Sequence, residues 1–402
     1  MIMNQRTAAA NLSRLSTLDI NPWHTRHFKE RGNDQRGSYS RDRDRIMHSD
    51  SFRKLQYKTQ VFVVHEGDFF RTRLTHTLEV SQIGRGIARI LRLNEPLVEA
   101  ICLAHDLGHT AFGHAGEHAL QELLKKYNFE WNSNAHSLQV VDELELQYCE
   151  HFGLNLTWVT REGLARHQTF YDVPSVKDQY DIYAQPSLEA QLCNLADVIA
   201  YATHDIEDAL VAGILKADAL SALRINIWDT AWRKANDEYT KSQRQGFRPG
   251  VDKQQIVFKR AHRHLIDALI RDSIEETKAR ANKAGVRTVE EVRGLNLPLV
   301  ALSVEVEGEV KRLLDFMMGN MYRSPVIARQ SSRASHILHS LFTALIENHK
   351  LLPVRIQERI DAGNEPAQEI ARFLAALTDR SAVDLYTELF EPTERSFGHK
   401  IL

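Results

Sequence analysis

Helical spacing of apolar residues is the feature that most constrains how this chain folds. From residue 72 to residue 390, apolar residues recur three and four positions apart, which is the period of an amphipathic helix. Helices that each carry one apolar stripe must bury that stripe against other helices. The pattern therefore predicts an all-α fold in which helices pack on helices.

The same period marks the ends of the individual helices. One helix is expected to begin near Ser40 and to run through RDRDRIMHSDSFRKLQY. The stretch VFVVHEGDFF (61–70) instead predicts one short β-hairpin with its turn at Glu66–Asp68. The other expected helices cover residues 72–92, 96–107, 115–127, 134–150, 157–168, 187–212, 252–283, 298–318, 326–350, 354–361, 366–377 and 381–390.

A polar stretch, NDEYTKSQRQGFRPG (236–250), has the composition of a linker. We expect residues 39–235 to form the core of the molecule and residues 251–402 to form a C-terminal helical lobe packed on that core. Residues 1–38 mix polar residues with proline and glycine and predict an irregular N-terminal arm.

Composition excludes several classes of protein. The 402 residues are 43% hydrophobic and 26% charged with a net charge of −2, which is typical of a soluble globular protein and indicates neither nucleic-acid nor membrane binding. The three scattered cysteines, Cys102, Cys149 and Cys193, favour a reducing compartment and argue against cysteine metal ligands. The N-terminus lacks a signal-peptide core, and no segment has the roughly 18 apolar residues that span a bilayer. We expect a cytoplasmic protein.

Four polar residues interrupt strongly apolar helical segments. His76 lies in RLTHTLEV, His105 and Asp106 lie in HDLGH, and Asp197 lies in NLADVIAYATHDIED. An ionised aspartate in such surroundings costs free energy unless it is paired or binds a metal. Two imidazoles and two carboxylates suit one divalent ion (Mn²⁺, Mg²⁺, Fe²⁺, Co²⁺, Ni²⁺ or Zn²⁺) and leave positions open for water and substrate. The alternative is that these are ordinary core histidines and helix-end aspartates.

The stretch HDLGHTAFGHAGEHA continues from this pair. His109 is four residues after His105 on the same helical face, and His114 and Glu117 are three residues apart on a new helix, a spacing that suits general acid–base chemistry. Gly108 and Gly113 are expected to break the helix so that the chain bends around a substrate and lets phosphate approach the backbone.

Asp197 also begins a second pattern. Asp197, Tyr201 and Asp205 are four residues apart in turn, so one helix face carries a carboxylate, a phenol and a carboxylate. A polar helix edge is the alternative interpretation, although it fits poorly with the apolar neighbours of these residues.

Four sequence blocks together resemble one enzyme family. RDRDRIMHSDSFRKLQYKTQVF, RTRLTHTLEV, HDLGHTAFGHAGE and ADVIAYATHDIED are similar to the HD-domain deoxyguanosinetriphosphate triphosphohydrolase (dGTPase, or dNTP triphosphohydrolase) family, over roughly residues 20–210. The resemblance implies an all-α HD-domain fold with one divalent metal ion per subunit. It implies metal-dependent hydrolysis of a deoxynucleoside triphosphate, by attack at the α-phosphorus, to deoxynucleoside and inorganic triphosphate. It also implies a homo-oligomer, hexamer or tetramer, and a possible activating nucleotide.

The resemblance also implies roles for individual residues. His114 and Glu117 correspond to the catalytic pair, and His76, His105, Asp106 and Asp197 to the metal ligands. The implied substrate contacts are phosphate for Arg73 and His109, sugar for Tyr201, the 3′-hydroxyl for Asp205, sugar and base for Gln60 and Val61, and the nucleotide pocket for Tyr322 and Arg323. His136 is a further expected substrate contact, while the roles of His118 and His167 stay open.

Two other functions remain as alternatives. One is a different HD phosphohydrolase, a 5′-nucleotidase or a phosphodiesterase, and the other is a non-catalytic HD-fold nucleotide sensor. The basic stretch from Lys241 to Arg263 could contact single-stranded DNA, but only Phe247 and Phe258 lie within it as stacking platforms, so this partner is not favoured. The sequence does not fix the base preference.

Overall fold

A computed structural model of the chain describes residues 12–20, 22–30, 35–61, 70–170, 179–215, 219–220, 222–246 and 252–391. Within these residues the structure is helical, and the one pairing of β type is an isolated antiparallel bridge between Thr59 and Thr72. The expected all-α fold is confirmed. Residues 62–69 of the expected hairpin lie outside the described residues.

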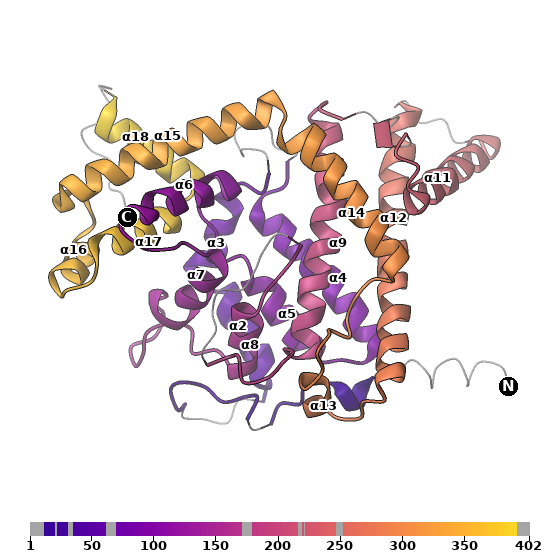
Figure 1. Cartoon of the computed structure of the whole chain (residues 1–402), viewed down its shortest axis with the longest axis horizontal. Helices are drawn as coiled ribbons and strands as arrows, with labels where there is room; N and C mark the ends of the chain where they lie inside the picture. Colours follow the sequence, from indigo (N-terminus) through magenta and orange to yellow (C-terminus); the bar gives the residue numbers. More distant parts are fainter. Residues whose placement is uncertain are drawn as a thin grey trace.

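The helices follow the chain in the order drawn in Figure 1. The first half contains α2 (Ser38–Met47), α3 (Asp50–Lys54), α4 (Arg73–Leu91), α5 (Glu95–Ala104), α6 (Gly113–Lys125), α7 (Ser133–Gln139), α8 (Trp158–Ala165) and α9 (Leu188–Val211). The second half contains α11 (Asn226–Arg244), α12 (Lys253–Ala284), α13 (Val289–Arg293), α14 (Val304–Met317), α15 (Pro325–Glu347), α16 (Val354–Asp361), α17 (Pro366–Ala376) and α18 (Asp379–Phe390).

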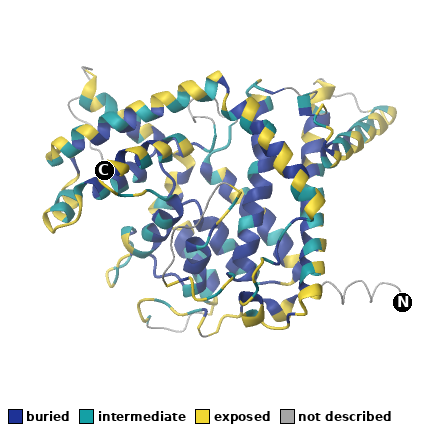
Figure 2. Cartoon of the chain, viewed as in Figure 1, coloured by how far each residue is buried: buried dark blue, intermediate teal, exposed yellow. Residues whose placement is uncertain are grey.

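The buried apolar side chains form two clusters. The larger cluster joins α2, α4, α5, α8, α9, α11, α12 and α14, and the smaller one joins α6 with α15, α17 and α18. In Figure 1 the smaller cluster lies on the left, where α15 crosses over α6, and Figure 2 shows α4, α5 and α9 as largely buried helices. Because α5 belongs to the larger cluster and α6 to the smaller one, the segment between these two helices connects the two clusters.

The expected linker is different in the structure. Residues 236–244 form the last turns of α11, so the interpretation of this part of 236–250 as an irregular linker was wrong. Trp228, Ala231 and Ala235 form the buried stripe of α11, and the polar residues after them lie on solvent-facing turns of the same helix. The predicted division into residues 39–235 and 251–402 stays a prediction, although α12 and α14 pack with the larger cluster.

Two expected helices are shorter than the sequence predicts, for one shared reason. The helix near Ser40 is interrupted at Ser49, whose side chain caps α3 by accepting a hydrogen bond from the Phe52 amide. The helix expected over 134–150 ends early, and Glu145 takes an extended conformation. The Glu145 carboxylate accepts hydrogen bonds from the Asp50 and Ser51 amides at 3.1 and 2.8 Å. Capping α3 therefore takes priority over extending the later helix.

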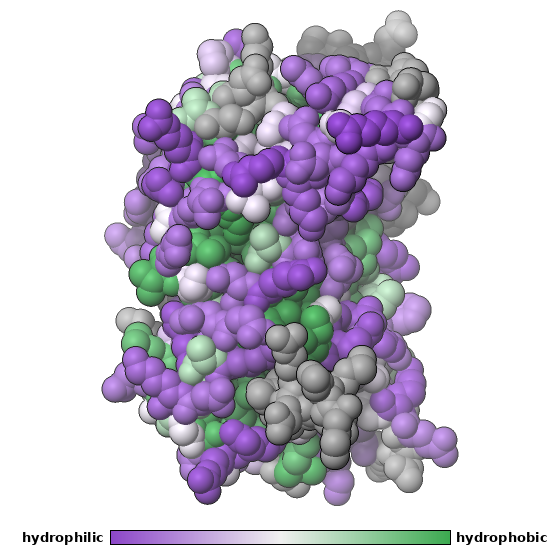
Figure 3. All heavy atoms as spheres, turned by 90° about the vertical axis from the view of Figure 1, so that its right-hand side faces the viewer, coloured by the Kyte–Doolittle hydropathy of each residue, from purple (hydrophilic) through white to green (hydrophobic). Residues whose placement is uncertain are grey.

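The surface on the side of α11 and α12 is largely hydrophilic, with hydrophobic residues in scattered patches (Figure 3). Part of the basic stretch from Lys241 to Arg263 is neutralised there, because Arg260 forms an ion pair with Glu238 of α11. His264, which follows this stretch, lies 3.1 Å from the same carboxylate. Among the helices that the structure describes, none combines the length and apolar character needed to cross a bilayer.

Candidate active site

The four predicted metal ligands come together from three helices. Thr72 caps α4 and places His76 in its first full turn, while α5 ends at Ala104 so that His105 and Asp106 lie at its carboxyl end. Asp197 lies in the middle of α9, which packs against both helices. All four side chains are buried, and the exposed fractions of the four residues are between 1% and 7%.

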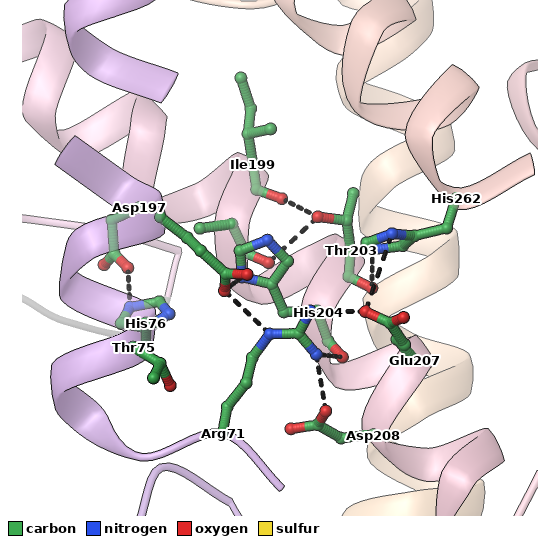
Figure 4. Close-up of polar contacts among 12 residues, drawn as sticks. Arg71, Thr75, His76, Asp197, Ile199, Thr203, His204, Glu207, Asp208 and His262 are labelled. Carbon is green, nitrogen blue, oxygen red and sulfur yellow. Dashed lines mark hydrogen bonds and ion pairs between the residues drawn. The ribbon is translucent and has the colours of Figure 1, made fainter. Parts of the chain in front are cut away.

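The distances among the four side chains are those of one compact cluster. His76 Nε2 lies 2.9 Å from Asp197 Oδ1 (Figure 4). His105 Nε2 lies 3.5 Å from Asp106 Oδ1 and 3.8 Å from Asp197 Oδ1. His76, His105 and Asp106 each offer one ligand atom, and these atoms lie within 4.8 Å of one another. The sequence pattern therefore identified residues that the fold does bring together.

The chemistry of His105 fits a cation at this position. Its Nδ1 lies 2.6 Å from the Cys102 carbonyl oxygen, which can only accept, so Nδ1 carries the proton and donates it. Burial lowers the pKa of His105, so the ring is neutral near pH 7 and Nε2 carries a lone pair. That lone pair faces carboxylate oxygens of Asp106 and Asp197 and has no hydrogen-bond partner among the described residues. A bound divalent cation between these facing acceptors would stabilise the arrangement.

Arg73 and His109 each contact one oxygen of the Asp106 carboxylate. Arg73 Nη1 donates to Asp106 Oδ2 at 3.0 Å, and His109 Nδ1 lies 3.0 Å from Asp106 Oδ1. Burial opposes the charge of Asp106, but His105, His109 and Arg73 outweigh it and hold its pKa well below the usual range. Arg73 Nε and Nη2 are buried without a partner in the described structure. Since buried donors without an acceptor are costly, these two donors are suited to an anionic ligand.

The predicted acid–base pair lies at the start of α6. His114 Nδ1 is 3.5 Å from Glu117 Oε2, and the side chains are 68% and 27% exposed. Ser133, the first residue of α7, donates from Oγ to Glu117 Oε1 at 2.6 Å. Burial opposes the Glu117 charge, but the hydrogen bonds of His114 and Ser133 lower its pKa. Glu117 is therefore a carboxylate with both oxygens engaged, and it fixes the orientation of the His114 ring.

Three of the residues predicted to meet the nucleotide share a cavity with His114. Gln60, Val61, His114 and Tyr322 line one small cavity between the start of α6 and the start of α15. The Tyr322 hydroxyl donates a hydrogen bond to Asp205, which is buried on α9. Burial raises the pKa of Asp205 to about 6. Tyr201 lies one turn before Asp205 on α9 and packs against the larger apolar cluster.

Three other polar residues are placed elsewhere. Arg323 is exposed at the end of the turn that follows α14. His136 is buried in a separate cavity of about 420 Å³, where its ring lies 4.7 Å from the ring of Trp131. His118 is exposed and lies 3.8 Å from Glu122 on the same helix. The structure does not bring these residues into contact with the metal-ligand cluster, so the substrate roles of Arg323 and His136 stay predictions.

Gly108 and Gly113 are required for different structural reasons. A Cβ atom at Gly108 would lie 2.1 Å from the Ser137 amide nitrogen, so Gly108 is required because the backbone of α7 packs directly against it. The expectation that Gly108 makes room for phosphate was therefore wrong. Gly113 has a φ of +56°, and Phe112 before it has a φ of +63°, a left-handed conformation that non-glycine residues rarely adopt.

Asp379, the first residue of α18, holds this strained segment in place. Its Oδ1 accepts from the Phe112 amide at 2.8 Å, and its Oδ2 accepts from the Thr59 amide at 3.0 Å. We refer to these contacts as the Asp379 clasp. The clasp ties together the two segments that border the cavity of Gln60 and His114, and it does so from the last helix that the structure describes.

Comparison with known proteins agrees with this site. Residues 73–202 match the HD domain family, and residues 300–388 match the phosphohydrolase-associated domain. The deoxyguanosinetriphosphate triphosphohydrolase-like protein of Geobacter sulfurreducens is 40% identical over 390 residues, which cover 95% of this chain and 97% of the relative. A protein of the same description from Ralstonia nicotianae is 44% identical over 358 residues, 88% of each chain.

The chain belongs to the deoxyguanosinetriphosphate triphosphohydrolase-like family. The HD-domain match includes all four candidate metal ligands, and the phosphohydrolase-associated match covers α15, α17 and most of α18. Together these matches indicate a phosphohydrolase.

His167, whose role the sequence left open, lies against the metal-ligand cluster. Its side chain is 2% exposed, and its Nε2 lies 3.4 Å from Asp197 Oδ2, the oxygen that His76 does not contact. His105, His167 and Asp197 also form a second group whose ligand atoms lie within 4.8 Å of one another. No spacing rule indicated this contact, because His167 follows α8 and precedes a long connection to α9.

Arg71 is a residue that sequence reasoning missed altogether. It lies before α4 and forms ion pairs with Glu79, Glu207 and Asp208, at 2.8, 2.5 and 2.6 Å (Figure 4). The ring of His204 lies between this network and His76, 6.3 Å from the His76 ring. His204 and Asp208 therefore belong to a structural network that fixes the ends of α4 and α9 beside the HD-domain cluster, and not to the cluster itself.

Proposed function

We propose that this chain is a metal-dependent deoxynucleoside triphosphate triphosphohydrolase. The proposal rests on one observation above all. His105 presents an unpartnered lone pair to two carboxylates, and Arg73, which pairs through Nη1 with the other oxygen of Asp106, keeps two buried donors, Nε and Nη2, without a partner in the described structure. A site with that arrangement suits a cation and an anionic group together, as a phosphate ester with a divalent metal provides. The substrate class follows from the relatives, which are described as deoxyguanosinetriphosphate triphosphohydrolase-like proteins.

His76, His105, Asp106 and Asp197 would hold the metal, with His167 against the second oxygen of Asp197. When bound, a divalent ion supplies Lewis-acid stabilisation of the negative charge on a phosphate oxygen. Arg73 and His109 then bind phosphate oxygens beside it. Burial and the charge of Arg73 lower the pKa of His109 to about 3, so His109 contributes as a neutral ring.

His114 and Glu117 handle the proton in this proposal. A water oxygen forms a bond to the α-phosphorus, the bond between that phosphorus and the 5′-oxygen breaks, and the deoxynucleoside leaves with a proton on its 5′-oxygen. His114 lies at the mouth of the cavity and transfers that proton, while Glu117 holds the ring in position. Ser133 keeps Glu117 in its position through the second carboxylate oxygen.

Tyr201 and Asp205 select deoxyribose in the same proposal. Both lie on the α9 face that begins at Asp197, and a hydrogen bond joins Asp205 to Tyr322, which lines the cavity. A phenol packed where a 2′-hydroxyl would lie excludes a ribonucleotide by steric conflict and by the loss of the hydrogen bonds of that hydroxyl. A hexameric or tetrameric assembly and an activating nucleotide remain predictions of the family resemblance.

The decisive experiment is a product analysis. Each of the four dNTPs is incubated with the purified protein and Mn²⁺ or Mg²⁺, and the products are separated by ion-exchange chromatography. Deoxynucleoside together with intact triphosphate supports the proposal. Release of a monophosphate or of orthophosphate alone would indicate a different HD phosphohydrolase, and tight dNTP binding without turnover would indicate a nucleotide sensor.

A further inference from the structure

Gln330 on α15 lines the proposed nucleotide cavity. Its side-chain amide has no hydrogen-bond partner among the described residues. Both of its side-chain polar atoms, Oε1 and Nε2, are buried and make no hydrogen bond in the described structure. A buried amide that satisfies neither its donor nor its acceptor costs free energy, and such groups in folded proteins call for an explanation. A ligand that supplies both an acceptor and a donor is the simplest explanation.

The surroundings of Gln330 fit one part of a nucleotide. The same cavity is lined by His114, by the aromatic residues Phe112 and Tyr322 and by the apolar residues Val61 and Ile327. Among the residues that the structure describes, no aspartate, glutamate, lysine or arginine lines it. The phosphate-binding groups Arg73 and His109 lie on the metal side instead. An apolar cavity with two amides and an aromatic ring suits an uncharged, flat heterocycle.

We propose that Gln330 hydrogen-bonds the edge of the nucleobase and makes the site tolerant of all four bases. This inference rests on the proposed function. A carboxamide presents one acceptor and one donor, and a 180° rotation of its end exchanges them. The pairing edge of every base offers a neighbouring donor and acceptor: the amino group and ring nitrogen of adenine and cytosine, and the carbonyl and N–H of guanine and thymine. One glutamine can therefore satisfy each base in one of its two orientations.

A carboxylate at position 330 should make the site selective for one base instead of tolerant of all four. The side chain introduced by Gln330→Glu can only accept hydrogen bonds when it is ionised, so it matches guanine, which presents two adjacent N–H donors, at N1 and N2. It opposes thymine, in which carbonyl oxygens flank the single N–H donor. Because a good bidentate contact to a base discriminates strongly, we expect the ratio of kcat/KM for dGTP over dTTP to rise by about tenfold or more.

The experiment measures kcat and KM for the four dNTPs with wild type, Gln330→Glu and Gln330→Met at pH 8. Wild type should show values of kcat/KM within about tenfold of one another. Gln330→Met keeps the volume but removes both hydrogen-bonding atoms, so it should lose kcat/KM for all four bases, mainly through KM. Thermal unfolding of each variant checks that the fold is intact.

Ala328→Glu is the matched control. Ala328 is exposed on the same helix, so this variant adds the same charge without placing it in the cavity, and the base ratios of wild type should persist. If Gln330→Glu shows the same base ratios as Ala328→Glu, Gln330 does not contact the base and the inference is wrong. If wild type itself releases no triphosphate from any dNTP, the proposed function fails, and that outcome is distinct from the first.

Discussion

The candidate metal-ligand cluster and the acid–base pair both take residues from the stretch His105–Glu117, yet they are built in opposite ways. His76, His105, Asp106 and Asp197 are almost fully buried, on helices that belong to the larger apolar cluster. His114 and Glu117 lie at the start of α6, are partly exposed and sit where the two apolar clusters meet. The first group is fixed by helix packing, whereas the second depends on contacts from α7 and α18.

This difference separates two requirements of catalysis. A metal site needs ligands held at fixed distances, and close-packed helices provide them. Proton transfer and substrate entry need access to solvent, and a segment between two clusters provides that. Mutations in the first region should therefore act through metal content, and mutations in the second through turnover at constant metal content.

The largest effect is expected for Asp197→Asn. This change keeps the size of the side chain but removes the charge that His76 and His167 both contact. We expect loss of bound metal, measured by inductively coupled plasma mass spectrometry after loading with Mn²⁺ and removal of the excess by dialysis, and turnover below detection. A variant that keeps one equivalent of metal would show that Asp197 is not a ligand.

His114→Ala tests the second region. Removing a general acid–base group lowers turnover by about 10²–10⁴-fold, while the metal content should equal that of wild type. His118→Ala is the control, because His118 lies one turn further along α6 and is exposed. If His114→Ala loses its metal, the two regions are not separable and the assignment is wrong.

His167→Ala sharpens the comparison within the buried cluster. Because His167 lies against the second oxygen of Asp197, we expect the dissociation constant for Mn²⁺, measured by calorimetry, to rise by about 10–100-fold. His167→Gln keeps a donor at this position and should recover part of the affinity. Equal Mn²⁺ affinity in wild type and His167→Ala would mean that His167 is only a packing residue.

Lys58 tests how the two clusters are joined. It is buried and donates to the His109 and Ala375 carbonyls, so it connects the active-site segment to α17. Burial, then the charges of Lys54 and Arg73, lower the pKa of Lys58 to about 7. Between pH 7 and the ordinary lysine pKa of about 10.4, the unfolded chain binds the proton and the folded chain does not, so stability rises with pH.

Urea unfolding of wild type and Lys58→Met from pH 7 to pH 9 measures this effect. The difference in the free energy of unfolding, wild type minus variant, should increase by about 1.4 kcal/mol per pH unit. A difference independent of pH would show that Lys58 stays protonated in the folded chain.

The helices and the candidate metal ligands could be predicted from the sequence because both depend on local patterns. The period of apolar residues fixes a helix, and a charged residue in an apolar helix has few explanations, so the grouping of His76, His105, Asp106 and Asp197 could be predicted. His167, Lys58 and Gln330 could not, because their meaning comes from partners far away in the chain. The early end of α7 likewise depends on Glu145 capping α3 from 95 residues away.

The Asp379 clasp has a consequence for how such enzymes can be recombined. A carboxylate on α18 holds Phe112 in a left-handed conformation two residues before His114, the proposed proton-transfer residue. In a chimaera that joins the N-terminal part of this chain to the C-terminal helices of a relative, the candidate metal ligands would come from this chain. The conformation of the backbone at Phe112 would depend on the residue that the relative supplies in place of Asp379. Exchange between family members should succeed only where the relative supplies an acid at the first position of the helix equivalent to α18, which makes that position a compatibility determinant for chimaeras.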